Sequence, residues 1–258
     1  MIDVTAIPAF DDNYIWMLHE GEHAAVVDPG EAAPVLAWLA HHDKKLTAIL
    51  LTHHHGDHTG GVAALRAAQG HTVPVIGHTL DTHRLPPLSI AVSDGDQIPV
   101  PGLALTLQVM ATPGHTVGHI CYTGGGLLFC GDTLFSAGCG RMFEGSPLQF
   151  HTSLTRLSLL PPDTWVFAAH EYTLGNVHFA AALTPQDETL QQALANVRER
   201  RARGEFTLPS SIGWERRHNP FLRCADPVLA MAAGLKPDAA PEAVFGALRR
   251  AKDVFRAP

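Results

Sequence analysis

The sequence lacks the features that mark membrane, secreted and nucleic-acid-binding proteins. No apolar run approaches the roughly 18 residues that a membrane-spanning helix needs. The N-terminal segment, residues 1–14, has no basic start followed by an apolar stretch, so it does not resemble a signal peptide. Positive charge is scarce, because 18 Lys and Arg face 25 Asp and Glu for a net charge of −7. This balance argues against general nucleic-acid binding. Together these absences predict a cytoplasmic protein that binds neither membrane nor nucleic acid.

Cysteine is also sparse, and a phosphate-binding loop is missing. The four cysteines show neither CxxC spacing nor the density of a disulfide scaffold, so reduced thiols are expected. The glycine-rich stretch GGGLLF lacks the GxxxxGK[ST] spacing and precedes a strand-like run rather than a helix. The remaining composition is that of a folded chain, since 46% of its 258 residues are apolar. This length suits one large domain with a smaller one.

The first two-thirds of the chain alternates strand-like with helical patterns, which predicts an α/β fold. Strands are expected at 14–18, 24–28, 46–52, 74–78, 103–113, 119–123, 127–133 and 164–170. Helices are expected between them at 31–42, 58–69 and 147–160. After Tyr172 the pattern turns helical and polar, with helices expected in 185–206 and 241–255. We therefore predict a catalytic domain at 1–173 and a helical domain at 174–258.

Histidine is abundant, with 17 residues, and four of them fall within 53–58 in the segment LTHHHGDHTGG. His53 and His55, two apart where a strand ends, can point into one cavity, and His54 between them is expected to face solvent or to be hydrogen-bonded behind the site. Asp57 and His58 follow where a helix begins and so face a neighbouring point. This spacing favours two adjacent metal ions. Zinc, iron and manganese all accept imidazole nitrogen and carboxylate oxygen.

Further candidate ligands also stand where strand-like runs end. They are His115 in TPGHT, Asp132 in CGDTLF and His170 in AAHEYT. Reactive groups collect at strand ends in layered α/β folds because the loops converge while the sheet holds them. A carboxylate can bridge two cations, and Asp132 is the residue expected to do so. The predicted division is His53, His55 and His115 on one ion, and Asp57, His58 and His170 on the other.

The motifs THHHGDH, TPGH, GDTLF and HEYT, in this order, resemble the metallo-β-lactamase superfamily. More narrowly they resemble its glyoxalase II branch, the hydroxyacylglutathione hydrolases, a likeness that extends over GCGRMFEG, NPFLR and LRRAKDVF. The resemblance implies an αββα sandwich with a C-terminal all-helical domain. It also implies a substrate, the glutathione thioester S-D-lactoylglutathione, hydrolysed to D-lactate and glutathione in methylglyoxal detoxification.

The same resemblance implies where glutathione binds. The matching positions are Arg141, Tyr172, Arg249 and Lys252, and a tyrosine usual in the family is replaced here by Phe143. Arg249 and Lys252, three apart on a predicted helix, would share a face and could bind a carboxylate. The alternative for both is a solvated helix surface, and for Tyr172 it is simple packing beside the site.

Two cations about 3.5–4 Å apart can share a water and turn it into hydroxide near neutral pH. Such a hydroxide would attack the thioester carbonyl, and the thiolate leaves without a dedicated protein acid. Asp57 is the candidate catalytic residue, as it could orient the hydroxide besides ligating. We expect two divalent ions per chain, zinc first and iron or manganese as alternatives, in a monomer.

Three other functions fit parts of the pattern. One is a mononuclear iron glutathione-persulfide dioxygenase of the same fold, against which His170 and the helical extension argue. A nuclease of the superfamily is disfavoured by the acidic charge. A non-catalytic module that binds metal or glutathione is disfavoured by the complete ligand set. Counting metal ions per chain separates the first alternative from the hydrolase.

Overall fold

The computed structural model describes residues 2–69 and 71–256. The chain divides into two compact units. The first unit contains the residues up to Ala111 together with Gly118–Gly131. The second unit contains Thr112–Val117 and the chain from Asp132 onward. No helix among the described residues combines the length and the apolar character that crossing a membrane requires.

The first unit contains a six-stranded sheet with the strand order β1-β2-β3-β4-β5-β6. Its strands are β1 (Asp3–Ala9), β2 (Asn13–Glu20), β3 (His23–Val27), β4 (Lys45–Leu50), β5 (Val75–His78) and β6 (Ile90–Val92). The pairs β1–β2 and β2–β3 are antiparallel, and the pairs from β3 to β6 are parallel. Parallel strands need crossover connections, which α1 (Ala32–His41) and α3 (Val62–Gln69) supply between β3, β4 and β5. The expected strands at 14–18, 24–28, 46–52 and 74–78 are confirmed.

Four more strands of the first unit follow one another in the order β10-β9-β8-β7. They are β7 (Gln97–Pro99), β8 (Thr106–Ala111), β9 (Ile120–Gly124) and β10 (Leu127–Gly131). Their pairs are antiparallel. Gly125 and Gly126 form the turn between β9 and β10 with φ of 60° and 79°, a region that favours glycine. The hairpin expected at this glycine run is confirmed.

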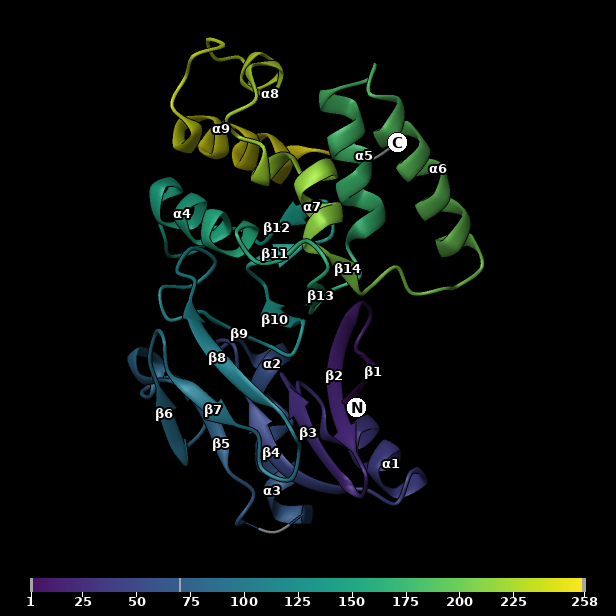
Figure 1. Cartoon of the computed structure of the whole chain (residues 1–258), viewed down its shortest axis with the longest axis vertical. Coiled ribbons are helices and arrows are strands. Elements are labelled where there is room, and N and C mark those ends of the chain that lie inside the picture. Colours follow the sequence, from purple (N-terminus) through teal and green to yellow (C-terminus); the bar gives the residue numbers. More distant parts are fainter. Residues whose placement is uncertain (1, 70, 257–258) are drawn as a thin grey trace. The chain divides into compact units, whose positions relative to one another are not determined.

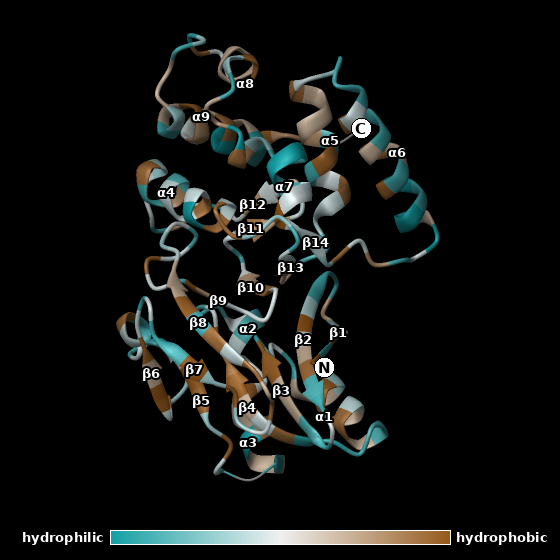
Figure 2. Cartoon of the chain, viewed as in Figure 1, coloured by the Kyte–Doolittle hydropathy of each residue, from teal (hydrophilic) through white to brown (hydrophobic). Residues whose placement is uncertain are grey.

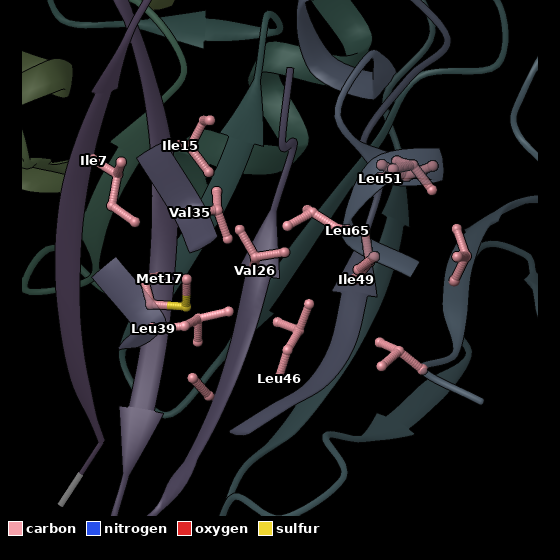
Figure 3. Packing of buried hydrophobic residues seen from close by; sticks show 14 of the residues in the cluster. Ile7, Ile15, Met17, Val26, Val35, Leu39, Leu46, Ile49, Leu51 and Leu65 are labelled. Carbon is pink, nitrogen blue, oxygen red and sulfur yellow. The ribbon is translucent and has the colours of Figure 1, made fainter. Parts of the chain in front are cut away.

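Buried apolar side chains fill the core beneath the six-stranded sheet (Figure 3). Val26, Ile49 and Leu51 are fully buried, and Val35 and Leu39 of α1 pack against the same cluster. Figure 2 shows β3 and β4 as largely hydrophobic, as expected for central parallel strands covered on both faces. This core fixes the direction in which β4 delivers the histidine-rich segment that follows it.

The helix expected at 58–69 is interrupted. The structure has a short α2 (Gly56–Thr59) and then α3, separated by Gly60 and Gly61. A side chain at Gly61 would come within 2.6 Å of the Pro29 carbonyl oxygen, and the Gly61 N–H donates to that same oxygen. The close approach of two backbones therefore divides the predicted helix. It also sets the short turn on which Asp57 and His58 lie.

The second unit is mainly helical (Figure 1). Its helices are α4 (Pro147–Ser158), α5 (Thr173–Leu183), α6 (Glu188–Ala202), α7 (Ile212–His218), α8 (Pro227–Ala232) and α9 (Pro241–Val254), with the 3-10 helix η2 (Pro220–Leu222). Ser146 and Gln149 form a capping box at the start of α4, and Asp187 caps α6. Figure 2 shows α6 as largely hydrophilic, in accord with its predicted polar character.

Two small pairs of strands belong to the second unit. β11 (Leu134–Phe135) pairs antiparallel with β12 (Gly138–Cys139) in a hairpin that directly follows Asp132. β13 (Trp165–Ala168) pairs antiparallel with β14 (Ser210–Ser211) and ends two residues before His170. The strand expected at 164–170 and the helices expected at 147–160, 185–206 and 241–255 are confirmed. The domain boundary expected after residue 173 stays a prediction.

Candidate metal centre and substrate pocket

In the first unit, candidate ligands gather where β4 ends and α2 begins. His53 and His58 are 1% exposed. His53 Nε2 lies 3.0 Å from His55 Nδ1, and His58 Nε2 lies 3.4 Å from an oxygen of Asp57. Two ligand atoms bound tetrahedrally to one zinc at about 2.0–2.1 Å stand roughly 3.3–3.4 Å apart. Both pairs therefore have close to the spacing that a shared cation requires.

Asp28, at the end of β3, determines which ring nitrogens of His53 and His58 carry a proton. Its carboxylate, 4% exposed, accepts hydrogen bonds from the Thr52 N–H at 2.8 Å and from the Thr52 hydroxyl at 2.7 Å. The Thr52 oxygen can then accept from His53 Nδ1 at 3.1 Å, and Asp28 accepts from His58 Nδ1 at 3.1 Å. Protons on both Nδ1 atoms place the imidazole lone pairs on the Nε2 atoms, which could then ligate a metal. Asp28 is thus an orienting carboxylate that the sequence reasoning missed, although it too ends a strand.

Asp57 is held by contacts from the start of β2 and from the loop after β3. Its Oδ2 accepts a hydrogen bond from the Asn13 amide at 3.1 Å. Its backbone passes so close to Gly30 that a side chain there would meet the Asp57 carbonyl oxygen at 1.9 Å. Only glycine fits such an approach. The Asp57 side chain is 40% exposed, more open than the histidines beside it.

Two further histidines support this cluster. His119 is fully buried, and its ring stacks on the His53 ring with centroids 4.8 Å apart. The sequence reasoning missed it, and its position just before β9 was the available signal. His54 lies 3.2 Å from the buried Asp81, which also accepts from Arg84 at 3.1 Å. His54 is therefore hydrogen-bonded rather than simply solvated, one of the two predicted alternatives.

In the second unit, the two oxygens of Asp132 face two different histidines. Oδ2 lies 3.3 Å from His115 Nε2, and Oδ1 lies 3.3 Å from His170 Nε2. All three residues are at least nine-tenths buried. His115 Nδ1 contacts the Arg141 carbonyl at 2.8 Å, which places the proton on Nδ1 and the lone pair on Nε2, the atom that could ligate a metal. This is the arrangement expected of a carboxylate placed between two cations.

A cavity of about 670 Å³ in the second unit brings these residues together with the predicted glutathione contacts. Its lining includes both His115 and Asp132 and all five predicted substrate-binding residues, namely Arg141, Phe143, Tyr172, Arg249 and Lys252. The volume is within the range of pockets for small molecules of this kind. Residues that are up to 141 positions apart in the sequence, His115 and Arg256, thus line one cavity.

Tyr172 and Phe143 present exposed rings in this cavity. The Tyr172 ring stacks on the His170 ring, with centroids 4.8 Å apart and an interplanar angle of 4°. The Phe143 ring lies 5.2 Å from the His115 ring in an edge contact, and the residue is 62% exposed. Phe143 therefore does not face a core. A hydroxyl added to its ring would meet solvent or a bound ligand.

The two cationic residues of α9 differ in their surroundings. Arg249 is 5% exposed, and its Nη1 donates to the Cys139 carbonyl at 2.8 Å and to the Gly140 carbonyl at 3.3 Å. Its buried Nε has no hydrogen-bond partner among the described residues. Lys252 is half-buried, and its Nζ donates to the Gly175 carbonyl at 2.8 Å. Burial, with a smaller contribution from Arg249, lowers the pKa of Lys252 to about 8.

Family models of known proteins match nearly the whole chain. The family model for the Metallo-beta-lactamase superfamily matches residues 9–170, and the model for the Hydroxyacylglutathione hydrolase C-terminus matches residues 171–255. A curated relative from Pseudomonas entomophila, named Hydroxyacylglutathione hydrolase, is 51% identical over 265 residues, covering 99% of this chain and 100% of its own.

Solved structures show the same fold. The crystal structure of ETHE1 from Myxococcus xanthus aligns with a TM-score of 0.68 and 26% identity, over 100% of this chain and 93% of its own. The structure of TTHA1623 in a di-iron-bound form aligns with a TM-score of 0.61 and 26% identity, over 85% of this chain and 100% of its own. The predicted metallo-β-lactamase sandwich with a C-terminal helical domain is therefore confirmed.

The fold and the clusters of histidine and aspartate define a metallo-β-lactamase-type protein with a divalent metal site. Within this superfamily, the chain belongs to the hydroxyacylglutathione hydrolase family.

Proposed function

We propose that this chain hydrolyses S-D-lactoylglutathione to D-lactate and glutathione. The observation that carries the proposal is the second-unit cavity, in which two candidate metal ligands, His115 and Asp132, share a lining with Arg141, Arg249 and Lys252. Glutathione has two carboxylates and one ammonium group, so its thioester carries net negative charge, which these cationic residues suit. Relatives named hydroxyacylglutathione hydrolase over the whole chain support the same reaction.

The donor set fits two divalent ions. We propose that His53, His55 and His115 hold one ion and Asp57, His58 and His170 the other, with Asp132 ligating both. Support comes from the spacing of the ligand atoms within each unit and from the Nδ1 contacts that leave Nε2 atoms available. Zinc is the first candidate, with iron or manganese as alternatives, and the structural neighbour TTHA1623 is described in a di-iron-bound form. Such ions, when bound, acidify water and polarise a carbonyl.

The chain's own residues would then bind and orient the substrate. Lys252 and Arg141 would bind glutathione carboxylates, while the Tyr172 ring would pack against the peptide at the edge of the site. Asp57 is the proposed catalytic residue, because its carboxylate, fixed at Oδ2 by Asn13, could accept a hydrogen bond from the attacking water. The glutathione thiolate is a fair leaving group, so the site needs no separate proton donor.

The remaining parts of the proposal concern the state of the protein. We propose a cytoplasmic monomer with a catalytic domain at 1–173 and a glutathione-binding helical domain at 174–258. The four cysteines are buried and form no disulfide with one another, which suits a reducing compartment. The mononuclear iron dioxygenase is the less supported alternative, since the C-terminal family model matches the helical region from residue 171.

The proposal is tested by the loss of thioester absorbance with S-D-lactoylglutathione. Purified protein should hydrolyse this thioester, lose activity after dialysis against a chelator and regain it on addition of zinc. An S-acyl thioester of a small thiol without the glutathione peptide should be hydrolysed with a much higher KM. Inactivity of the metal-loaded protein toward the glutathione thioester would overturn the proposal.

A further inference from the structure

The hairpin formed by β11 and β12 joins Asp132 to Arg141 and is held almost entirely by side chains from elsewhere in the second unit. Each of its strands has two residues, too few for a stable hairpin by itself. Five of the six backbone carbonyls from Phe135 to Gly140 accept hydrogen bonds from buried side chains. These are Phe135 and Gly138 from Asn219, Ser136 from Asn176, and Cys139 and Gly140 from Arg249.

Glu215 of α7 occupies the centre of this arrangement. It is fully buried, and one carboxylate oxygen accepts from the Ala137 N–H at 2.9 Å and from the Asn219 amide at 3.0 Å. Its other oxygen accepts from the Ser210 hydroxyl at 2.6 Å. Ala137 has a φ of 54°, a conformation that a residue with a side chain adopts only when its surroundings hold it there. Glu215 therefore holds both the turn of the hairpin and the asparagine that binds its two strands.

The two ends of the hairpin reach the candidate metal ligands. Asp132 precedes it, and after it the Arg141 carbonyl contacts His115 Nδ1 at 2.8 Å. A change in the hairpin would shift the Asp132 carboxylate and the orientation of the His115 ring together. These two residues face one another at 3.3 Å, so a small displacement alters the spacing of their ligand atoms.

We propose that Glu215, acting through Asn219 and the Ala137 N–H, is a positioning residue that keeps Asp132 and His115 in metal-binding geometry. The inference rests on the proposed function, in which both residues are ligands. Burial raises the pKa of Glu215 to about 7. A glutamine at this position would keep one acceptor oxygen for Ala137 and Asn219 and could donate to the Ser210 oxygen, so it should preserve the hairpin.

The test is a zinc titration of chelator-treated protein in competition with a chromophoric chelator. Removal of a partner that orients a metal ligand costs about 10–100-fold in affinity. We expect Glu215→Ala to weaken zinc binding about tenfold, and Glu215→Gln to stay within about twofold of the wild type. The control is Leu229→Ala, which creates a cavity beside α8, because Leu229 is 1% exposed. It should lower the melting temperature without weakening zinc binding.

If Glu215→Ala does not fold, Asn219→Ser gives the same test. Serine can still accept from the Phe221 N–H, as Asn219 does now, but it cannot donate to the Phe135 and Gly138 carbonyls together. It should also weaken zinc binding about tenfold. Unchanged zinc affinity in the folded variants, or an equal loss in Leu229→Ala, would overturn the inference. Absence of binding of zinc, iron and manganese by the wild type would instead overturn the proposed function, and the inference with it.

Discussion

Raising the pH from about 7 to about 9 should weaken thioester binding through Lys252, because its ammonium group loses its proton in this range. The residue is half-buried, and its Nζ donates to the Gly175 carbonyl at 2.8 Å and lies 5.5 Å from the centroids of both Phe179 and Phe255. Burial first and Arg249 second lower the pKa of Lys252 to about 8. The side chain is thus charged at neutral pH and neutral in mild alkali.

The magnitude follows from this pKa. Roughly ten in eleven Lys252 side chains are protonated at about pH 7 and roughly one in eleven at about pH 9. If glutathione binds through the ammonium, KM should rise about tenfold over this interval. The turnover of the bound complex should not show this dependence, because a bound carboxylate raises the pKa of the lysine and keeps it protonated.

The assay is a series of initial rates, followed by the loss of thioester absorbance, with KM and kcat determined at each pH. Lys252→Met keeps the apolar stem without the charge. Its KM should be high and should not show the rise with pH that deprotonation of Lys252 causes. Lys252→Arg stays charged and should keep a low KM in mild alkali. Substrate ionisation affects the KM of each variant equally, so its contribution cancels in the ratio of two KM values measured at the same pH. A wild-type KM that does not change, or an equal rise in Lys252→Met, would refute this role for Lys252.

Four other substitutions give separate predictions. Asp132→Ala should abolish hydrolysis and lower metal content at both positions, because its two oxygens face two histidines. His170→Ala should deplete one ion of the two, and elemental analysis checks both variants, since two retained ions would contradict the assignment. Phe143→Tyr should lower KM about two- to tenfold through one added hydrogen bond worth roughly 0.5–1.5 kcal/mol, with kcat nearly unchanged. An unchanged KM with an intact melting temperature would remove that position from the site. Arg249→Ala should raise KM and also lower the free energy of unfolding by roughly 1–3 kcal/mol in urea, because buried carbonyls lose their donor. A higher KM at unchanged stability would show that the arginine contributes nothing to holding the hairpin.

Much of the fold could be predicted from the sequence because its signals are local. The apolar runs before His53, Asp132 and His170 are short and end in polar residues, and each proved to be a strand delivering its ligand candidate at the end. The hairpin at Gly125 and Gly126 was likewise predictable from its glycines. These features depend on a few adjacent residues and on a sheet that buries their apolar neighbours.

What could not be predicted depends on contacts between distant residues. Arg249 is buried against the hairpin, where it donates to the Cys139 carbonyl, 110 positions away in the sequence. No pattern along α9 indicates this contact. Glu215 belongs to α7, which was not predicted as a separate helix within the expected helical domain, and its partner Ala137 lies 78 positions away. Asp28 is a different case. It ends a strand as the proposed ligands do, and only its contacts with Thr52 and His58 distinguish an orienting carboxylate from a ligating one.

The measurement that tests the central claim most directly is the metal content of the purified protein, determined by elemental analysis on the sample whose hydrolysis of S-D-lactoylglutathione is followed. We expect two divalent ions per chain together with rapid loss of the thioester absorbance. One iron per chain, with oxygen uptake on a glutathione persulfide and no thioester hydrolysis, would contradict the account.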